Sequence, residues 1–329
     1  MRVSVVVTVL NEGMAIHRLL DSLVAQTRRP DEVIVVDGGS RDGTVAALGA
    51  AAQSSRLPLK ALVEPGANIS RGRNVAIAAA SGDVIASTDA GVRLTPDWLA
   101  ALLAPFGGHK PPQVVSGVFV PDAHDTFETA MSATVLPAVG EINPATFLPS
   151  SRSVAFTRSA WQAVGGYPEW LDYCEDLVFD LRLRERFHQF GYAPQAVAYF
   201  RPRGSLRSFF KQYYLYARGD GKADLWRKRH LIRYLTYLVV LPLLLVLGWL
   251  NGPWWWAAGV AIGTVGYMGM PYRRLWPRLK QMRRGDRLQA VLWVPVIRVT
   301  GDVAKMIGYP VGLLWRLKRL RPQPELRWR

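Results

Sequence analysis

The first ninety residues alternate between short apolar runs and segments with helical periodicity. The apolar runs are rich in β-branched residues, which is typical of strands buried on both faces of a parallel sheet. These runs are 3–10, 33–36, 59–63 and 84–88. The segments between them predict helices over 13–26, 42–54 and 71–81. Because strands and helices alternate strictly, the pattern predicts βαβ units and an α/β fold with a mostly parallel sheet.

Two of the apolar runs end in a carboxylate. Asp37 follows the run 33–36, and Asp89 follows the run 84–88. Open α/β sheets bind their ligands at the carboxyl ends of the strands. The two acids therefore predict one cleft that holds a cation, or an anion carried by a metal. The alternative is that each acid only caps the loop after it.

Four motifs in a fixed order resemble family 2 glycosyltransferases with the GT-A fold. They are the run from Val3 to Asn11-Glu12, VIVVDGGSRDGT at 33–44, ISRGRNVAIAAASGDVIASTDAG at 69–91, and Gly165-Gly166-Tyr167 followed by Glu175-Asp176. The resemblance covers about 1–220. It implies a Rossmann-like mixed sheet that is flanked by helices and binds a nucleotide sugar.

The resemblance also implies a set of donor-binding residues near the strand ends. These are Thr8, Asn11, Glu12, Asp37, Arg71, Arg73 and Asp89. A nucleoside diphosphate leaving group needs its charge neutralised, usually by a divalent metal with oxygen ligands, so we expect Mg²⁺ or Mn²⁺ with Asp89 as its ligand.

The predicted metal site departs from the family pattern. The family usually has Asp-x-Asp where this chain has Asp89-Ala90-Gly91. Either other ligands complete the metal site, or Arg71 and Arg73 neutralise more of the phosphate charge. Both arginines lie at the start of a predicted helix that begins after Ser70, and a helix N-terminus favours anions. A solvated face is the alternative for these two side chains.

Inverting transfer requires a base that deprotonates the acceptor hydroxyl. The resemblance places it in Glu175-Asp176, which opens a predicted helix with Leu177, Leu181 and Phe187 facing inward. We expect Asp176 to be the base and Glu175 its neighbour, with Asp172 as the second choice. Acids in a first turn also serve as plain partners of the helix dipole.

The acceptor side is less well marked. The resemblance implies Gly166 and Tyr167, and a loose likeness of the segment 212–216 to an acceptor motif adds Gln212 and Tyr216. The segment 205–218 is aromatic, basic and amphipathic, which suits a membrane surface or an ordinary packing helix. Cys174 is the only cysteine, which suits a cytosolic domain.

Basic charge concentrates in the C-terminal part of the chain. Residues 201–329 hold 25 of the 41 Lys and Arg but only 5 of the 25 Asp and Glu. Long apolar stretches interrupt the basic ones, which favours anionic membrane lipids over nucleic acid as partners. The stretches 231–250 and 253–270 predict two membrane spans, and their basic flanks predict that the catalytic domain faces the cytosol. A buried helical hairpin is the alternative.

The remaining segment, 288–315, contains charged residues on one helix face. It predicts an amphipathic or re-entrant helix followed by a basic tail, with a third span as the alternative. The predicted domains are a catalytic domain over 1–225 and a membrane region over 226–329. The first divides into a nucleotide-sugar half, 1–91, and an acceptor half with an interfacial helix, 92–225. We expect a cut after about residue 225 to release a soluble domain.

These observations predict an inverting glycosyltransferase that is anchored as a multi-pass protein in the cytoplasmic membrane. It would move a sugar from a nucleotide-diphosphate sugar to a lipid, lipid-linked or polysaccharide acceptor of the cell envelope. One alternative is a catalytically weak membrane protein that binds sugar nucleotides. Another is a polyprenyl-phosphate glycosyl synthase, although the Glu175-Asp176 pair favours a hydroxyl acceptor because a phosphate is already ionised.

Overall fold

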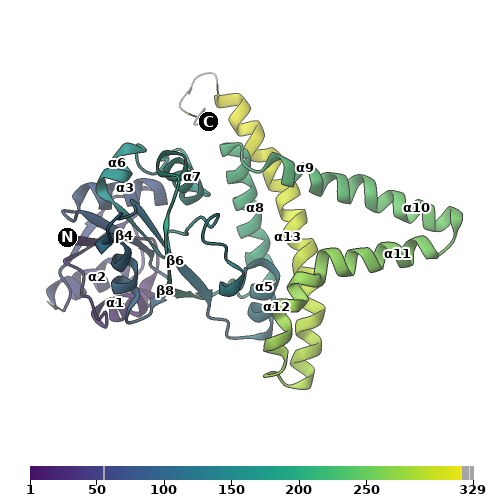
Figure 1. The fold of residues 1–329 in the computed structure, drawn as a ribbon, viewed down its shortest axis with the longest axis horizontal. Coiled ribbons are helices and arrows are strands. Elements are labelled where there is room, and N and C mark those ends of the chain that lie inside the picture. Colours follow the sequence, from purple (N-terminus) through teal and green to yellow (C-terminus); the bar gives the residue numbers. More distant parts are fainter. Residues whose placement is uncertain (55, 321–325, 327–329) are drawn as a thin grey trace. The chain divides into compact units, whose positions relative to one another are not determined.

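The computed structural model describes residues 1–54, 56–320 and 326, and the chain forms two compact units (Figure 1). The first, called the sheet unit here, comprises 1–122 and 139–201. The second, called the helical unit, comprises 123–138 and 202–329. The chain therefore passes through the helical unit once before it completes the sheet.

The sheet unit is built on one sheet of eight strands in the order β3-β2-β1-β4-β7-β6-β8-β5. Its strands are β1 (Val3–Val9), β2 (Glu32–Asp37), β3 (Leu59–Val63), β4 (Val84–Asp89), β5 (Val92–Leu94), β6 (Val114–Pro121), β7 (Val154–Thr157) and β8 (Gly191–Phe200). The first four are parallel, as predicted, while β7 pairs antiparallel with β4 and β6, and β5 pairs antiparallel with β8. The sheet is thus mixed, as the resemblance implied.

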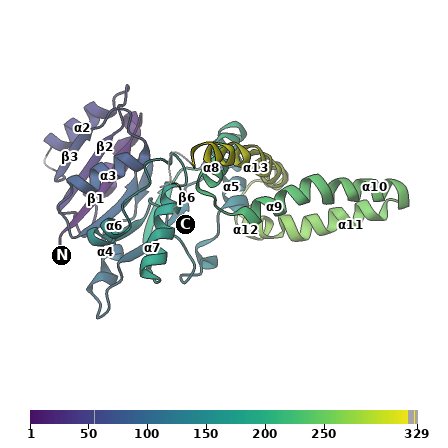
Figure 2. The ribbon, with the colours of Figure 1, turned by 90° about the horizontal axis from the view of Figure 1, so that it is seen from above.

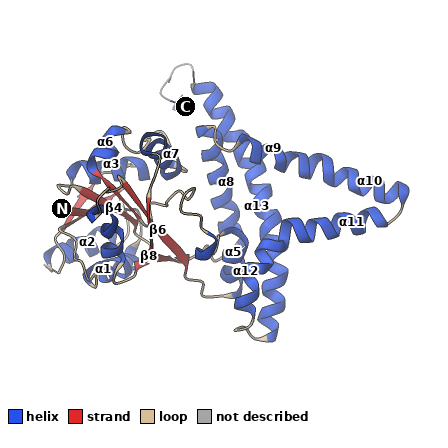
Figure 3. Cartoon of the chain, viewed as in Figure 1, coloured by secondary structure: helices blue, strands red, loops and turns tan. Residues whose placement is uncertain are grey.

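Helices cover both faces of the sheet (Figure 3). One apolar core lies under α1 (Ile16–Val24), α2 (Thr44–Gln53) and α4 (Trp98–Leu103), and the other under α3 (Ile69–Ala79), α6 (Arg158–Ala163) and α7 (Glu175–Phe187). Val5 and Val7 of β1 belong to the first core and Val6 to the second, because successive side chains of a strand point to opposite faces. Three short 3₁₀ turns complete the unit, Gly13–Ala15, Ala104–Gly107 and Val139–Glu141.

Two local expectations in this unit were wrong. The N-cap of α3 is Asn68, whose side chain accepts from the Arg71 amide, whereas the Ser70 hydroxyl donates to the Leu171 carbonyl at 3.0 Å. In α7 the buried apolar residues are Val178, Phe179 and Leu183. Leu177 and Leu181 are partly exposed, whereas Phe187 packs against the core as expected. Contact with the sheet sets which stripe of a helix is buried, and the apolar pattern alone left this ambiguous.

The helical unit consists of one helix from the middle of the chain and the whole C-terminal region. Its helices are α5 (Thr126–Val135), α8 (Leu206–Ala223), α9 (Arg227–Leu235), α10 (Leu241–Asn251), α11 (Trp254–Ile262), α12 (Gly269–Leu279) and α13 (Arg284–Arg319), with π-helical turns at Thr236–Val240 and Gly263–Met268. Helices α8 and α13 lie side by side, and α10 and α11 form a hairpin that extends away from them (Figure 2). The core contains Phe127, Phe209, Leu275, Val294 and Ile297.

Glycines allow α8 and α13 to approach closely. A Cβ atom at Gly312 would lie 2.0 Å from the Arg218 carbonyl oxygen, and one at Gly308 would lie 2.2 Å from that of Tyr214. Small residues at a helix interface permit such contact between backbones. The segment 288–315 is therefore part of one continuous helix with a face packed on α8.

One helix in the described part of the chain, Arg227–Asn251, is long and apolar enough to cross a membrane. Only 6% of its most apolar window is buried, whereas the core helix of a water-soluble protein is mostly buried. The second predicted span, 253–270, falls in α11, the following π-helical turn and the start of α12, and adds no further helix of this kind. Most of the predicted basic tail, 321–325 and 327–329, lies outside the described residues.

Candidate functional site

The carboxyl ends of three adjacent strands bring the predicted acids to one edge of the sheet. The register of β1 pairs Thr8 with Asp89 of β4 and Val9 with Asp37 of β2. Helix α3 passes close to this edge, because a Cβ atom at Gly72 would lie 2.8 Å from the Thr8 methyl group. The predicted donor-side residues thus surround the end of β1.

Asp37 is fully buried and its carboxylate is used by the turn that follows β2. Its Oδ2 accepts from the amides of Gly39, at 2.9 Å, and Ser40, at 2.8 Å, and its Oδ1 accepts from the Ser40 hydroxyl. These contacts are the ones expected if Asp37 only caps the loop that follows its strand. Asp37 shapes the loop at the edge of the site.

The loop after β1 is tied to the same turn. Asn11 has a left-handed backbone, with φ of +54°, and its amide donates to the Ser40 hydroxyl at 2.7 Å. Its side-chain oxygen accepts from the Arg41 amide at 2.9 Å, and the Glu12 amide donates to the Thr44 hydroxyl at 2.9 Å. These hydrogen bonds fix the two loops that border the predicted nucleotide site relative to each other.

Arg73 connects the end of β4 to the start of α7. Its side chain is 3% exposed; one guanidinium nitrogen donates to Asp89 at 2.9 Å and another to Glu175 at 2.6 Å. Burial lowers the pKa of Arg73, but the two carboxylates outweigh burial and raise it overall, so the guanidinium stays charged. Arg71, by contrast, is largely exposed and pairs with Glu64 at 2.6 Å.

The start of α7 gathers three acids with different surroundings. Burial, and next the charge of Asp176, raise the pKa of Glu175 to about 7. Asp176 is partly exposed, and its Oδ1 accepts from the Leu177 amide at 2.8 Å. Burial and the same neighbouring charge raise the pKa of Asp180 well above its ordinary value. Asp176 is therefore the member of this group with both solvent access and a place beside the Arg73 network.

The residue before these acids has a strained backbone. Cys174, the N-cap of α7, has φ of +64°, in the left-handed region that non-glycine residues seldom adopt. Asn11 at the end of β1 is in the same region. These two positions border predicted site residues, but His188, Asp224 and Trp226 adopt the same backbone region elsewhere in the described chain, so this strain does not by itself mark the site.

Arg152 is part of the site although the sequence analysis missed it. Its Nε lies 3.5 Å from Asp89 Oδ2, opposite the oxygen that Arg73 contacts. The guanidinium stacks 4.8 Å from the Phe200 ring centroid, and the Thr88 hydroxyl donates to the Arg152 carbonyl at 2.9 Å. No local motif marks this position. The antiparallel pairing of β7 with β4 brings it there.

The predicted acceptor residues are divided between the two units, and the ring centroid of Tyr167, in the sheet unit, lies 5.3 Å from the Arg73 guanidinium. Tyr167 is 1% exposed, stacks on Phe179 with 4.1 Å between ring centroids, and donates its amide to Asn74 at 2.9 Å. Gly166 has φ of +70° in the turn before it. These two residues support the core under α3. Gln212 and Tyr216 belong to α8 of the helical unit and hydrogen-bond to each other at 2.8 Å.

The side chains around Asp89 do not fit a metal site built from carboxylates. Both carboxylate oxygens of Asp89 are in contact with guanidinium groups, and Gly91 offers no side-chain ligand. Across the described residues, no group of three or more His, Cys, Asp or Glu is arranged to hold a metal ion. Divalent hard cations take several oxygen ligands, and Asp89 alone supplies one carboxylate.

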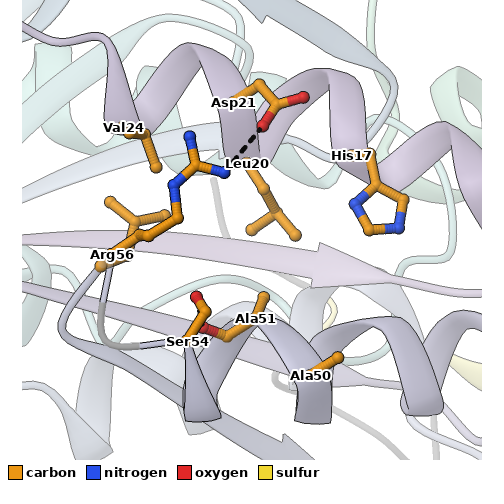
Figure 4. Close-up of a pocket in the computed structure, with 9 residues that line it drawn as sticks. His17, Leu20, Asp21, Val24, Ala50, Ala51, Ser54 and Arg56 are labelled. Carbon is orange, nitrogen blue, oxygen red and sulfur yellow. Dashed lines mark hydrogen bonds and ion pairs between the residues drawn. The ribbon is translucent and has the colours of Figure 1, made fainter.

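A pocket elsewhere in the sheet unit is not part of this site (Figure 4). It lies between α1 and α2, where Arg56 pairs with Asp21 at 3.8 Å, and Leu57 borders it just before β3 begins. It is therefore beside the amino end of a strand, away from the carboxyl ends that carry the acids.

Residues 4–157 match the family model described as Glycosyl transferase family 2. Among curated proteins, the O-antigen chain rhamnosyltransferase RfbN of Salmonella typhimurium is 24% identical over 225 residues, which cover 65% of this chain and 71% of RfbN. The validoxylamine A glucosyltransferase of Streptomyces hygroscopicus subsp. limoneus is 31% identical over 116 residues, which cover 35% of this chain and only 26% of that enzyme.

Solved structures share the fold at low sequence identity. The mannosyltransferase PcManGT of Pyrobaculum calidifontis, in complex with GDP-Man and Mn²⁺, has a TM-score of 0.57 and 21% identity over 93% of this chain and 87% of its own. TarS 1–349 of S. aureus, in complex with UDP-GlcNAc, has a TM-score of 0.51 and 18% identity over 97% and 92%. These likenesses show the fold.

Proposed function

We propose that this glycosyltransferase, whose residues 4–157 match the Glycosyl transferase family 2 model, transfers a sugar with inversion from a nucleotide-diphosphate sugar to a membrane acceptor. The fold that it shares with solved glycosyltransferases supports the proposal. The resemblance given by the four sequence motifs is thereby confirmed. The proposed acceptor is a lipid, a lipid-linked saccharide or a polysaccharide. GDP-Man and UDP-GlcNAc in the two solved structures support the class of donor.

The observation that carries the proposal is the buried Arg73, which contacts Asp89 on the donor side and Glu175 beside the proposed base. Sugar transfer requires that the anomeric carbon of the donor and the base that takes the proton of the acceptor hydroxyl are held in one rigid arrangement. Arg73 supplies such a frame, since it fixes the β4 end and the α7 start relative to each other through one planar group.

In the proposed reaction the acceptor oxygen attacks the anomeric carbon of the sugar. The bond from that carbon to the phosphate oxygen breaks, and the nucleoside diphosphate leaves with the bonding electrons. Asp176 takes the proton of the acceptor hydroxyl as the new bond forms. Glu175 and Arg73 do not react; they hold the first turn of α7 in place.

The sequence also predicted Mg²⁺ or Mn²⁺ at Asp89. The Mn²⁺ in the mannosyltransferase structure supports a divalent ion in relatives of this fold. The side chains around Asp89 in this chain do not fit a divalent ion. No step of the proposed reaction therefore passes through a metal.

A membrane location is supported by the exposed apolar helix Arg227–Asn251. We propose that this helix and the segment after it, 253–270, enter the cytoplasmic membrane as a hairpin, with the sheet unit in the cytosol. Basic residues on both flanks favour that orientation. The relative RfbN is an O-antigen chain enzyme, which supports a cell-envelope acceptor.

One assay tests the proposed activity directly. Membranes that contain the full-length protein are incubated with a panel of radiolabelled nucleotide sugars and then extracted with organic solvent. We expect one sugar to enter the lipid extract or a polymer, and Asp89→Ala to abolish that transfer because the β4 end loses its anchor. Absence of transfer from every donor would contradict the proposal, as would unchanged transfer by Asp89→Ala.

Topology is tested separately by labelling single introduced cysteines in a Cys174→Ala background. A label at Asn251 should react only from the extracytosolic side and one at Arg284 only from the cytosol. Reaction of both positions from the same side would contradict the hairpin.

A further inference from the structure

A cluster of charged and aromatic side chains lies where the α10–α11 hairpin meets α13 in the helical unit (Figure 1). Tyr237 and Tyr267 belong to the π-helical turns at the two ends of the hairpin, and their hydroxyls are 3.1 Å apart. The Tyr237 hydroxyl also donates to Asp302 of α13 at 3.3 Å. The Tyr267 ring centroid lies 4.3 Å from the guanidinium of Arg298, one helical turn earlier. Both ends of the hairpin are thus held to one face of α13.

The charged members of this cluster are mostly positive. Arg233 donates to Asp302 at 2.7 Å, and Lys305 lies 3.9 Å from the same carboxylate oxygen. Arg298 adds a third cation on the face of α13 that carries Asp302 and Lys305, because these positions are four and three residues apart. Burial lowers the pKa of Lys305 to about 8; Asp302 opposes that shift, whereas Arg233 and Arg298 add to it. One carboxylate is therefore surrounded by several cations.

A second acid does not balance these charges. The charge of Asp220 also acts on Lys305, but the Asp220 carboxylate lies 3.2 Å from the Nε2 atom of His230. With Asp302 and Asp220 counted against Arg233, Arg298 and Lys305, the cluster keeps an excess of positive charge. An excess of this kind favours an anion as its ligand.

Arg298 is the member of the cluster that indicates where an anion binds. Its side chain is half-buried, and its Nε is buried with no hydrogen-bond partner among the residues that the structure describes. A ring face such as that of Tyr267 attracts a cation but leaves the N–H groups in the guanidinium plane to other acceptors. Buried donors are nearly always paired, and a donor on a cationic group is paired best with a charged acceptor.

The position of the cluster within the helical unit indicates the kind of anion. It lies at the base of the hairpin that we propose to enter the membrane from the cytosol, and lipid phosphates lie at the depth where such a hairpin leaves the hydrocarbon. Basic pockets beside membrane helices on the cytoplasmic side bind lipid head groups, and tyrosine is enriched at the same depth. Tyr237 and Tyr267 fit that position.

We propose that Arg298, together with Arg233 and Lys305, binds the phosphate of an anionic phospholipid in the cytoplasmic leaflet. The inference rests on the membrane location proposed above. Guanidinium groups suit a phosphate because their planar donors match its oxygens in pairs. Asp302 holds Arg233 and Lys305 in place, and the Tyr267 ring holds Arg298, so the lipid meets cations that are already positioned. A bound lipid would therefore stabilise the helical unit.

Thermal unfolding of the full-length protein in a non-ionic detergent tests this site. The additions are phosphatidylglycerol, phosphatidylcholine with the same acyl chains, inorganic phosphate and a polyprenyl phosphate. We expect phosphatidylglycerol to raise the midpoint by about 2–5 °C, because a ligand of the folded state stabilises it. Phosphatidylcholine and inorganic phosphate should each raise it by less than about 1 °C, since one has no net charge and the other has no acyl chains to enter the micelle.

Arg298→Gln separates a lipid-binding role from a structural one. Without lipid, the variant should unfold at the same temperature as the unchanged protein or higher, because it removes a half-buried cation that has an unpaired donor. With phosphatidylglycerol it should lose most of the shift. An Arg298 that only supports packing would instead give a lower midpoint in both conditions. Arg298→Lys should keep part of the shift, since it restores the charge but not the paired geometry.

Arg284→Gln is the matched control, because it removes the same charge from an exposed position near the start of the same helix. It should keep the full response to phosphatidylglycerol. Circular dichroism checks that each variant is folded, and should Arg298→Gln not fold, Lys305→Gln provides the same comparison.

Each outcome supports or overturns the inference. Equal shifts with phosphatidylglycerol and phosphatidylcholine, or a shift that survives in Arg298→Gln, overturn it. A shift with inorganic phosphate alone would mean a site for free phosphate, and a shift with polyprenyl phosphate alone a site for an acceptor-type lipid; both also overturn it. A shift with phosphatidylglycerol that is lost in Arg298→Gln and kept in Arg284→Gln supports it.

The labelling of the hairpin separates this inference from the membrane location on which it rests. If Asn251 and Arg284 react from opposite sides but phosphatidylglycerol has no effect, the inference fails and the membrane location stands. If both positions react from the same side, the membrane location fails, and the lipid site fails with it. The assay of sugar transfer tests the enzymatic activity independently of either result.

Discussion

Arg73 donates to Glu175 across 2.6 Å, with only 3% and 7% of the two side chains exposed. A buried pair of this kind is specific in geometry, but desolvation offsets much of its Coulomb energy. The charge of Asp176 next to the pair further disfavours the ionised form of Glu175. The ionisation of Glu175 should therefore make the stability of the protein depend on pH.

Glu175→Gln should change how stability depends on pH. The pKa of Glu175 is raised from 4.5 to about 7 in the folded protein, so the folded state holds this proton more tightly than the unfolded state does. Its contribution to stability is fully present below pH 4.5 and is lost as the pH rises through about 7. Urea unfolding at several pH values should show that fall in the unchanged protein and a smaller one in Glu175→Gln. Equal falls in the two proteins would contradict the raised pKa.

Asp176→Asn should lower turnover by at least about a hundredfold while donor affinity stays within about twofold. A base acts on the acceptor proton, so the donor keeps its contacts. Steady-state transfer and nucleotide binding, measured side by side, check this split. Asp172→Asn is the comparison, since Asp172 is the second candidate. Loss of turnover in that variant alone would move the role of base to Asp172.

Gly312→Ala should destabilise the helical unit by about 1–3 kcal/mol, because the new methyl group would lie 2.0 Å from the Arg218 carbonyl oxygen and force α8 and α13 apart. Gly285→Ala, in the same helix, meets no atom within 4 Å and should be neutral or stabilising by up to about 1 kcal/mol. Thermal unfolding in detergent compares the two. A Gly312→Ala protein as stable as the original would mean that the helices do not pack this closely.

Truncation after residue 225 should give a poorly soluble product, contrary to the expectation from sequence. Helix α5 remains in such a chain, while its core partners Leu275, Val294 and Ile297 are removed. Phe127 and Met131 would then face water. Size-exclusion chromatography should show aggregation, and Met131→Glu in the truncated chain should reduce it. A monomeric truncated chain without that substitution would contradict the packing of α5.

The sequence by itself determined the first four strands, the helices between them and the position of the two acids at strand ends. These features follow from local apolar periodicity and from the rule that parallel strands present their carboxyl ends together. The motifs likewise placed Glu175 and Asp176 at the start of a helix, where the structure has them. Each of these inferences needs only residues that are close together in the chain.

Only the tertiary structure decided what the acids contact. Asp37 accepts hydrogen bonds from the turn at Ser40, and Arg71 pairs with Glu64. Arg152 contacts Asp89 because β7 pairs with β4. The same holds for α5, which lies between strands in sequence but packs with the C-terminal helices. Contacts between residues far apart in the chain depend on strand order and on which helix face is buried, and a local pattern of apolar and polar positions carries no information about either.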